Sequence, residues 1–254
     1  MKRFDPGIVL GVLLLVGGGL ALAQALGYLN NASGYFWGGL FLAAGLAFLT
    51  MLFGGHWWSA FPGFTLAALG VLILLPESLQ EFGGSVFLGG IGLSFWYVYF
   101  TARTERWWAV IPAGVLTALA VMILATQQFE EFGGMIFLGG IGLSFFIVYL
   151  TDRAERWWAL IPAGVLTTLA GMTVAADQFG GFQSAGFFFF GLAITFLLVA
   201  VLAGMKWAYW PALALGVMGV LGIASLLQFA NYLWAVVLIA AGGFVLFRYF
   251  TANR

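Results

Sequence analysis

The sequence contains no cysteine and a single histidine, His56. The absence of cysteine excludes disulfide bonds, thiolate metal sites, iron–sulfur clusters and cysteine nucleophiles. A single histidine cannot form a bis-histidine haem site or a three-histidine zinc site within one chain. The motifs of zinc proteases, serine hydrolases and phosphate-binding loops are also missing. We therefore expect a protein that has no cofactor and is not an enzyme.

Charged residues are scarce as well. They make up 7% of the 254 residues, while 63% are hydrophobic and the mean hydropathy is +1.08. A soluble domain has roughly a quarter of its residues charged. The apolar residues form long runs, such as 8–23 and 133–150, as segments that span a lipid bilayer do. The formal net charge is zero, so no strongly basic surface for nucleic acid is expected.

An internal repeat is the strongest feature of the chain. Pairs of tryptophans recur at intervals of 50 residues, and a proline follows five residues after the first tryptophan of each pair. The three copies are Trp57, Trp58 and Pro62; Trp107, Trp108 and Pro112; and Trp157, Trp158 and Pro162. A looser copy begins at Trp207, with Pro211 one residue out of step. Residues 1–254 therefore form one transmembrane domain of five approximate repeats: 4–54, 55–104, 105–154, 155–204 and 205–254.

Each repeat is predicted to form two apolar helices. The proline suits the first turn of a helix, where its missing N–H has no partner to lose. The fold class is therefore all-α and membrane-embedded, with about ten short spans arranged as five tandem parallel hairpins. The predicted spans are 7–27, 35–53, 60–76, 83–101, 110–126, 133–150, 160–176, 185–203, 211–227 and 232–249. The first span imitates a cleavable signal peptide, but it matches the first helix of a repeat and is interpreted as retained.

The distribution of charge predicts the topology. All nine basic residues lie at a terminus or in a loop between repeats, whereas the charged residues in the loops within repeats are all acidic. The basic residues are Lys2, Arg3, Arg103, Arg106, Arg153, Arg156, Lys206, Arg248 and Arg254, and the acidic ones are Glu77, Glu81, Glu130, Glu131 and Asp177. By the positive-inside rule, both termini face the cytoplasm.

Three features have both a functional and a structural interpretation. The tryptophan pairs suit an aromatic belt at the membrane interface, and stacking on a ligand or pigment is the alternative. Glu81 and Glu131 are equivalent in the repeat and are weak candidates for a cation site, but acidic residues are also common in outward-facing loops. His56 aligns with Arg106 and Arg156, so an interfacial role is simpler than metal binding or pH sensing.

Glycines are the other repeated feature of the helices. Two segments, each with three glycines in four residues, resemble nucleotide-binding loops, but they lie inside apolar helices with no strand before them. The residues are Gly89, Gly90 and Gly92, and Gly139, Gly140 and Gly142. Small residues allow helices to approach closely in a membrane. We therefore expect these glycines to mark the packing faces of the second helix in each repeat.

The polar residues within the spans are hydroxyls and amides, with no ionisable group clearly inside a span. Repeat-equivalent Ser94 and Ser144 are examples, and their hydroxyls can bond to helix carbonyls or bridge two helices. Transporters coupled to protons or ions usually need intramembrane ionisable groups. A channel or transporter for a small solute is therefore the second hypothesis, after a non-enzymatic membrane protein.

A resemblance to known proteins rests on three segments of the chain. They are 106–116, 156–166 and the helix Phe-Leu-Gly-Gly-Ile-Gly-Leu-Ser-Phe that follows the first of them. The pattern resembles uncharacterised multi-span bacterial proteins and the two-helix transmembrane unit of LiaF-type cell-envelope stress regulators. The resemblance implies a location in the bacterial inner membrane. It carries over no functional residue, because its motifs are aromatic, glycine and proline positions.

The sequence favours a non-enzymatic integral membrane protein that acts as a scaffold, an accessory subunit of a larger complex or an envelope-associated module. Its expected partners are the lipid bilayer and other membrane subunits or further copies of itself. A channel or transporter and a lipid- or pigment-binding protein are the alternatives. A row of intramembrane polar residues along a common axis favours transport, whereas an exposed apolar groove favours binding.

Overall fold

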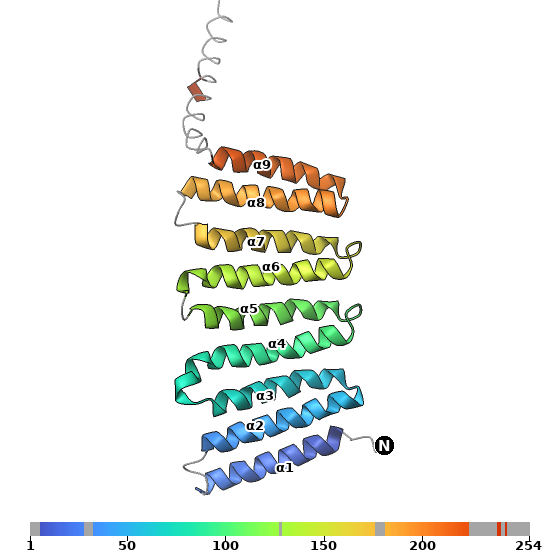
Figure 1. Ribbon diagram of the computed structural model, residues 1–254, viewed down its shortest axis with the longest axis vertical. Helices are drawn as coiled ribbons and strands as arrows, with labels where there is room; N and C mark the ends of the chain where they lie inside the picture. The colour runs from blue at the N-terminus through green and yellow to red at the C-terminus, as the bar shows by residue number, and fades with distance from the viewer. Residues whose placement is uncertain are drawn as a thin grey trace, which may run out of the picture. The chain divides into compact units, whose positions relative to one another are not determined.

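The computed structural model describes residues 6–27, 33–126, 129–175 and 181–223, together with 238, 239 and 242. The chain divides into two compact units, Met1–Ala170 and Gly171–Arg254, here called unit 1 and unit 2. All the regular secondary structure within the described residues is helical, so the predicted all-α class is confirmed (Figure 1).

The described part of unit 1 contains six complete α-helices and most of a seventh. They are α1 (Pro6–Ala25), α2 (Ser33–Thr50), α3 (Ala60–Leu74), α4 (Gly83–Thr101), α5 (Val110–Thr126), α6 (Gly133–Thr151) and α7 (Leu160–Ala175), the last of which continues into unit 2. Extensive contacts join α2 to α3, α3 to α4, α4 to α5, and α5 to α6. Successive helices run antiparallel and lie side by side in one layer (Figure 1). α1 contacts α2, and Trp37 Nε1 donates a hydrogen bond of 2.6 Å to Gln24 Oε1.

Unit 2 contains α8 (Gly181–Leu202) and α9 (Tyr209–Ile223), which pack against each other. The closest approaches involve glycine. A Cβ on Gly186 would overlap the backbone of Gly222 and Ile223 in α9, and one on Gly219 would stand 2.8 Å from the backbone nitrogen of Phe190 in α8. Glycine therefore allows the two helices to come together almost backbone to backbone.

Eight helical segments in the described part of the chain are long and apolar enough to cross a membrane. They are Gly34–Gly54, Trp57–Leu74, Glu77–Thr101, Trp107–Thr126, Gly133–Thr151, Trp157–Val174, Ser184–Leu202 and Lys206–Ile223. These correspond to the second to ninth predicted spans, so a multi-pass membrane protein is confirmed. The 20 residues of α1 cover the first predicted span, while the tenth, 232–249, lies outside the described residues apart from 238, 239 and 242.

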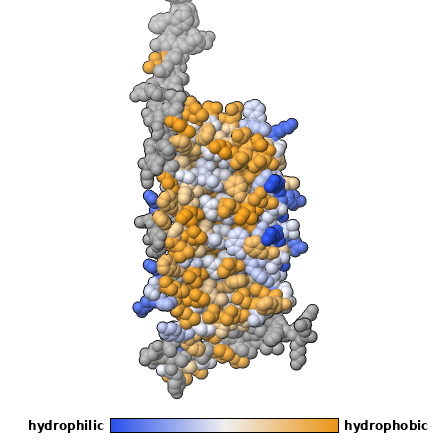
Figure 2. All heavy atoms as spheres, in the orientation of Figure 1, coloured by the Kyte–Doolittle hydropathy of each residue, from blue (hydrophilic) through white to orange (hydrophobic). Residues whose placement is uncertain are grey.

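Most of the buried residues in the described part of the chain are small, and the largest fully buried side chain is that of Leu160. Ala60, Ala109, Ala113 and Ala159 have no exposed surface, and the buried polar residues include Ser59 and Ser94. Only 22% to 33% of the residues in each candidate span are buried within the structure. Most large apolar side chains therefore face outward. In Figure 2 they cover the visible face of the helices, and hydrophilic residues gather along the two margins. An exposed surface of large apolar side chains suits contact with lipid.

The helices do not pack as separate hairpins. α3 contacts α2, from the preceding predicted repeat, at least as extensively as it contacts α4, its partner in the predicted hairpin. A Cβ on Gly70 in α3 would stand 2.5 Å from the backbone nitrogen of Leu42 in α2. The sequence repeat therefore sets the order of the helices, but the interface between repeats is as close as the one within a repeat.

Candidate functional site: the tryptophan turns

Four turns with the same backbone structure precede alternate helices. Each is one turn of 3₁₀ helix that leads directly into α3, α5, α7 or α9: η2 (Trp57–Ser59), η4 (Trp107–Ala109), η6 (Trp157–Ala159) and η8 (Lys206–Ala208). In each, the backbone N–H of the third residue donates a 3.0 Å hydrogen bond to the carbonyl of the residue before the turn. The third residue has no exposed surface in any of the four. Only serine or alanine occupies this position, because a small side chain allows the turn to pack against the helix layer.

The prolines of the repeat lie inside the first turn of the following helix. Pro62 is the third residue of α3, and Pro112, Pro162 and Pro211 have the same place in α5, α7 and α9. The N–H groups of a first turn have no acceptor within their helix, so proline costs no hydrogen bond there. The predicted role of these prolines agrees with this geometry.

The structure places Trp207 differently from the sequence alignment. Lys206 begins η8, so Trp207 occupies the second position of the turn, which Trp58, Trp108 and Trp158 hold in the others. With this alignment Pro211 is in step with the other prolines, and Met205 stands where Arg156 stands one turn earlier. The one-residue offset arose from matching Trp207 to the first tryptophan of a pair. The fourth turn retains only the second one.

The second tryptophan of each turn packs edge-to-face on a phenylalanine of the preceding helix. The ring pairs are Phe48–Trp58, Phe95–Trp108, Phe145–Trp158 and Phe196–Trp207, with centroids 6.1 to 6.4 Å apart and interplanar angles of 70° to 82°. These indoles are 37% to 47% exposed. A half-exposed indole anchored at the end of a span matches the predicted aromatic belt.

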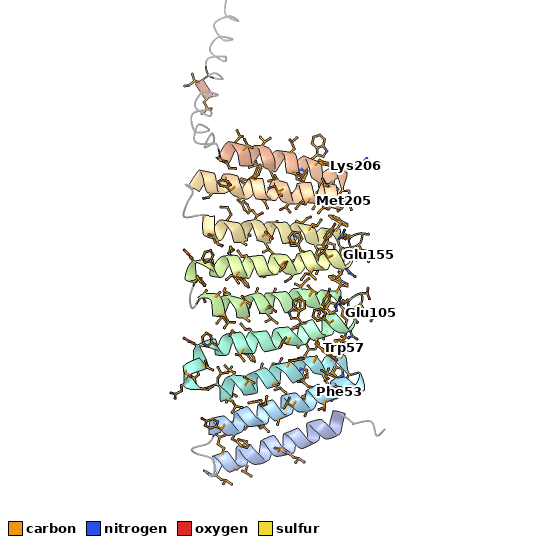
Figure 3. All side chains as sticks on the ribbon, viewed as in Figure 1. Phe53, Trp57, Glu105, Glu155, Met205 and Lys206 are labelled. Carbon is orange, nitrogen blue, oxygen red and sulfur yellow. The ribbon has the colours of Figure 1, made fainter. Side chains whose placement is uncertain are left out.

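The first tryptophan has another role, which is to receive an arginine from the next turn along the chain. The guanidinium carbon of Arg106 lies 4.4 Å from the ring centroid of Trp57, and that of Arg156 lies 4.8 Å from the ring centroid of Trp107. These are cation–π contacts at close range. Figure 3 places Trp57, Glu105 and Glu155, which mark these turns, at the same end of the helices of unit 1.

Each of these arginines is also held by a threonine at the end of the preceding helix. Arg106 Nη1 donates to Thr101 Oγ1 at 3.0 Å, and Arg156 Nη1 donates to Thr151 Oγ1 at 2.6 Å. Arg156 Nη2 also donates to the carbonyl of Thr104 at 3.4 Å. Arg156 is only 8% exposed. Its guanidinium therefore connects two successive turns of the layer, the one at 104–107 and its own.

Sequence reasoning placed the tryptophans at the interface but missed these contacts. The signal was present, because an arginine directly precedes two of the three tryptophan pairs. In the first turn His56 takes this position, and its Nδ1 is buried with no hydrogen-bond partner. The cation–π contacts between successive turns are therefore those of Trp57 with Arg106 and of Trp107 with Arg156. The residue before the turn is histidine in the first turn, His56, and methionine in the fourth, Met205.

The glycines of α4 and α6 lie against both neighbouring helices. A Cβ on Gly90 would collide with Ala68 of α3, whereas Cβ atoms on Gly89 and Gly92 would stand 3.7 Å from Ala120 Cβ and 3.3 Å from Leu116 Cβ of α5. The second segment repeats this pattern. Gly140 lies against α5 at Ala118, and Gly139 and Gly142 lie against α7 at Ala170 and Thr167. α4 and α6 each have a close neighbour on either side, and the two consecutive glycines allow close contact with both neighbours.

The buried hydroxyls in the spans are satisfied within their own helices. Ser94 Oγ donates to the carbonyl of Ile91 at 2.6 Å, Ser144 Oγ to that of Gly140 at 2.9 Å, and Thr195 Oγ1 to that of Gly191 at 3.0 Å. Ser144 also fills the space beside Gly114 of α5, where any Cβ would overlap its hydroxyl. Ser144 therefore also contributes to the packing of α6 against α5, while the hydroxyl protons of Ser94 and Thr195 are satisfied within their own helices.

The two candidate cation ligands, Glu81 and Glu131, are exposed and lie at the ends of different loops. Within the described ranges, no group of three or more histidine, cysteine, aspartate or glutamate residues is placed to hold a metal ion. Glu130 and Asp177 also lie in the acidic loops within repeats, but their side chains are not among those that the structure describes.

Comparison with known proteins found no protein-family model, no curated protein and no solved structure that matches this chain. The functional argument therefore rests on the geometry described above.

Proposed function

We propose that the chain is a non-enzymatic integral membrane protein that acts as a scaffold, an accessory subunit of a membrane complex or an envelope-associated module. The observation that carries this proposal is the single layer of helices in unit 1, in which at most a third of each span is buried. Large apolar side chains such as Leu93 and Leu143, which are 55% and 60% exposed, are available to lipid or to the helices of another protein. A layer of this kind presents more lateral surface than a compact bundle of the same length.

The polar groups support this proposal over the transport alternative. Transport of a solute needs polar side chains that face a common path through the membrane. Here the buried hydroxyls of Ser94, Ser144 and Thr195 bond to their own helices, and the charged residues described lie at helix ends. The relationship to LiaF-type transmembrane units remains part of the proposal, since both would place tandem two-helix units in a bacterial inner membrane.

The test of this function is to isolate the intact chain from its native membrane in polymer-bounded discs and to quantify the proteins present. We expect one membrane protein at a fixed ratio to the chain, and a tagged, unrelated multi-span protein should not retain it. A photo-crosslinking residue at exposed Leu143 should reach that partner, while one at fully buried Val98 should react only within the chain. Solute or ion flux into liposomes that contain only the purified chain would instead support a channel.

We further propose about ten spans in five tandem hairpins, with both termini in the cytoplasm. Supporting this, Arg103, Arg106, Arg153 and Arg156 lie at one end of the helices of unit 1, while Glu77, Glu81 and Glu131 belong to the turns at the other end. Short basic loops remain in the cytoplasm.

Labelling of single cysteines tests this topology without background, because the native chain has none. Ala102→Cys should react with a membrane-impermeant maleimide only after the cytoplasmic side is opened, whereas Glu81→Cys should react in intact spheroplasts. Both residues lie in turns outside the helices of the layer. Reaction of both variants from the same side would contradict the topology.

A further inference from the structure

The C-terminal end of α4 carries a column of stacked side chains that the repeat does not copy. The rings of Trp96 and Phe100 are stacked, with centroids 5.6 Å apart and an interplanar angle of 20°. The guanidinium carbon of Arg103 lies 5.1 Å from the ring centroid of Phe100 and 5.9 Å from that of Tyr99. A spacing of four residues places Trp96 and Phe100 on one side of α4, and Arg103, in the turn that follows the helix, lies over the ring of Phe100. A cation thus lies at the end of an aromatic strip.

This column faces outward, and its lower part is held in place. Phe100 is 56% exposed, and Leu93, three residues before Trp96, is 55% exposed. Trp96 Nε1 donates a 3.0 Å hydrogen bond to Thr117 Oγ1 of α5, which sets the plane of the indole. From Leu93 to Thr101, the last residue of α4, the helix rises roughly 12 Å at ~1.5 Å per residue. That length is comparable with the depth of one leaflet, which is half of a hydrocarbon core of ~30 Å.

The charge at the end of the column is not neutralised. Within the part of the chain that the structure describes, no carboxylate pairs with Arg103, whose contacts are with two rings. The turn 102–106 contains Arg103 and Arg106 but only one acidic residue, Glu105, which leaves an excess of one positive charge. An anionic group that reaches this turn from the membrane surface would meet an exposed guanidinium.

We propose that the face formed by Leu93, Trp96 and Phe100 of α4 and by Arg103 of the following turn binds one anionic phospholipid, in the leaflet on the side of the tryptophan turns. The lipid phosphate accepts hydrogen bonds from Arg103, because a guanidinium presents planar donors that suit phosphate oxygens. An acyl chain lies along Phe100, Trp96 and Leu93. The inference requires only that the chain spans a membrane. It is independent of whether the protein acts as a scaffold or an accessory subunit.

The next repeat provides a matched control within the same chain. The equivalent residues are Leu143, Phe146 and Leu150 of α6 and Arg153 of the turn after it. Leu143 and Leu150 are as exposed as their counterparts, at 60% and 58%. Leu150 replaces Phe100, so no ring at that position can stack under Arg153. Asp152 replaces Ala102, so the turn 152–156 has two acidic and two basic residues. This face has the same shape but lacks both the aromatic column and the charge excess.

Native mass spectrometry of the purified full-length chain tests the site. The chain is incubated in mild detergent with phosphatidylglycerol and phosphatidylcholine that carry identical acyl chains, and the retained lipids are counted. We expect one phosphatidylglycerol to be retained in preference. Arg103→Gln should reduce its retention about fivefold, the effect of one basic residue near an anionic lipid surface. Arg153→Gln should leave it unchanged.

A third variant tests the aromatic part of the site, and its result does not depend on whether Arg103→Gln folds. Phe100→Leu introduces the residue that α6 already carries, and it should lower phosphatidylglycerol retention without altering the elution of the protein. Equal losses in the two arginine variants would show general charge attraction and overturn the proposal, as would equal retention of the two lipids. Displacement of the lipid by millimolar glycerol phosphate would also overturn it, because the acyl chain would then contribute nothing.

Discussion

Replacing Gly70 with alanine is expected to lower the free energy of unfolding by about 2 kcal/mol. The new Cβ would stand 2.5 Å from the backbone nitrogen of Leu42 and 2.7 Å from the carbonyl oxygen of Gly38, both in α2. Backbone atoms cannot rotate out of the way, so α2 and α3 must separate. Alanine is a better helix former than glycine by up to ~1 kcal/mol, which offsets part of this cost.

Gly39→Ala is the matched control, because it makes the same substitution in the same helix pair. A Cβ on Gly39 would meet no atom within 4 Å. Helix propensity then acts alone, so this variant should be as stable as the native chain or more stable by up to ~1 kcal/mol. Both variants are compared by thermal or denaturant unfolding in one detergent. Equal stability of the two variants would show that α2 and α3 do not approach as closely as described.

Replacing Arg156 with glutamine is expected to destabilise the protein by roughly 2 to 3 kcal/mol, the combined effect of a partly buried cation–π contact and a charged hydrogen bond. The guanidinium lies over Trp107 at 4.8 Å and donates to Thr151 at 2.6 Å, with 8% of the residue exposed. Arg153→Gln, three residues away on an exposed part of the turn, should change stability by no more than ~0.5 kcal/mol.

A double-mutant cycle separates the stacking from the other contacts of Arg156. Trp107→Leu removes the indole, and it also removes the edge contact of Trp107 with Trp158 at 6.2 Å. The cycle cancels that second loss, and a coupling of about 1 kcal/mol between Arg156 and Trp107 is expected. If the two substitutions are additive, the guanidinium is held by Thr151 and the backbone alone.

The composition and the repeat allowed the positions of the helices to be predicted closely. The spans 83–101 and 110–126 coincide with α4 and α5, because glycine pairs, prolines and long apolar runs mark their ends. The prediction failed by one residue at Trp207, where similarity of side chains was mistaken for equivalence of backbone position. The geometry of the turns gives the correct alignment, because the buried third residue of each turn and the proline of the following helix must occupy the same positions in all four copies.

The sequence also predicted that the glycines of α4 and α6 would lie at helix contacts, but not which neighbour each would meet. Gly90 faces α3, while Gly89 and Gly92 face α5. The choice depends on how the helix is rotated relative to both neighbours, which no pattern within one helix specifies. The close contact of α2 with α3 was not predicted at all, because the glycines that allow it, Gly45 and Gly70, belong to no repeated motif.

The sequence by itself determined that this is a multi-pass, all-helical membrane protein, because a chain that is 7% charged and 63% hydrophobic has too little polar surface to fold in water. It also determined where the helices end and which ends carry the basic residues. Only the tertiary structure decided that successive helices of unit 1 form one layer, and that the two tryptophans of a pair differ in role. One packs on Phe95 or its counterpart in the preceding helix, and the other receives an arginine 49 residues later, as Trp57 receives Arg106. The physical reason is that apolar periodicity and composition act along one helix. The stacking of a cation on an indole depends on the distance between two turns, which exists only once the helices between them have packed.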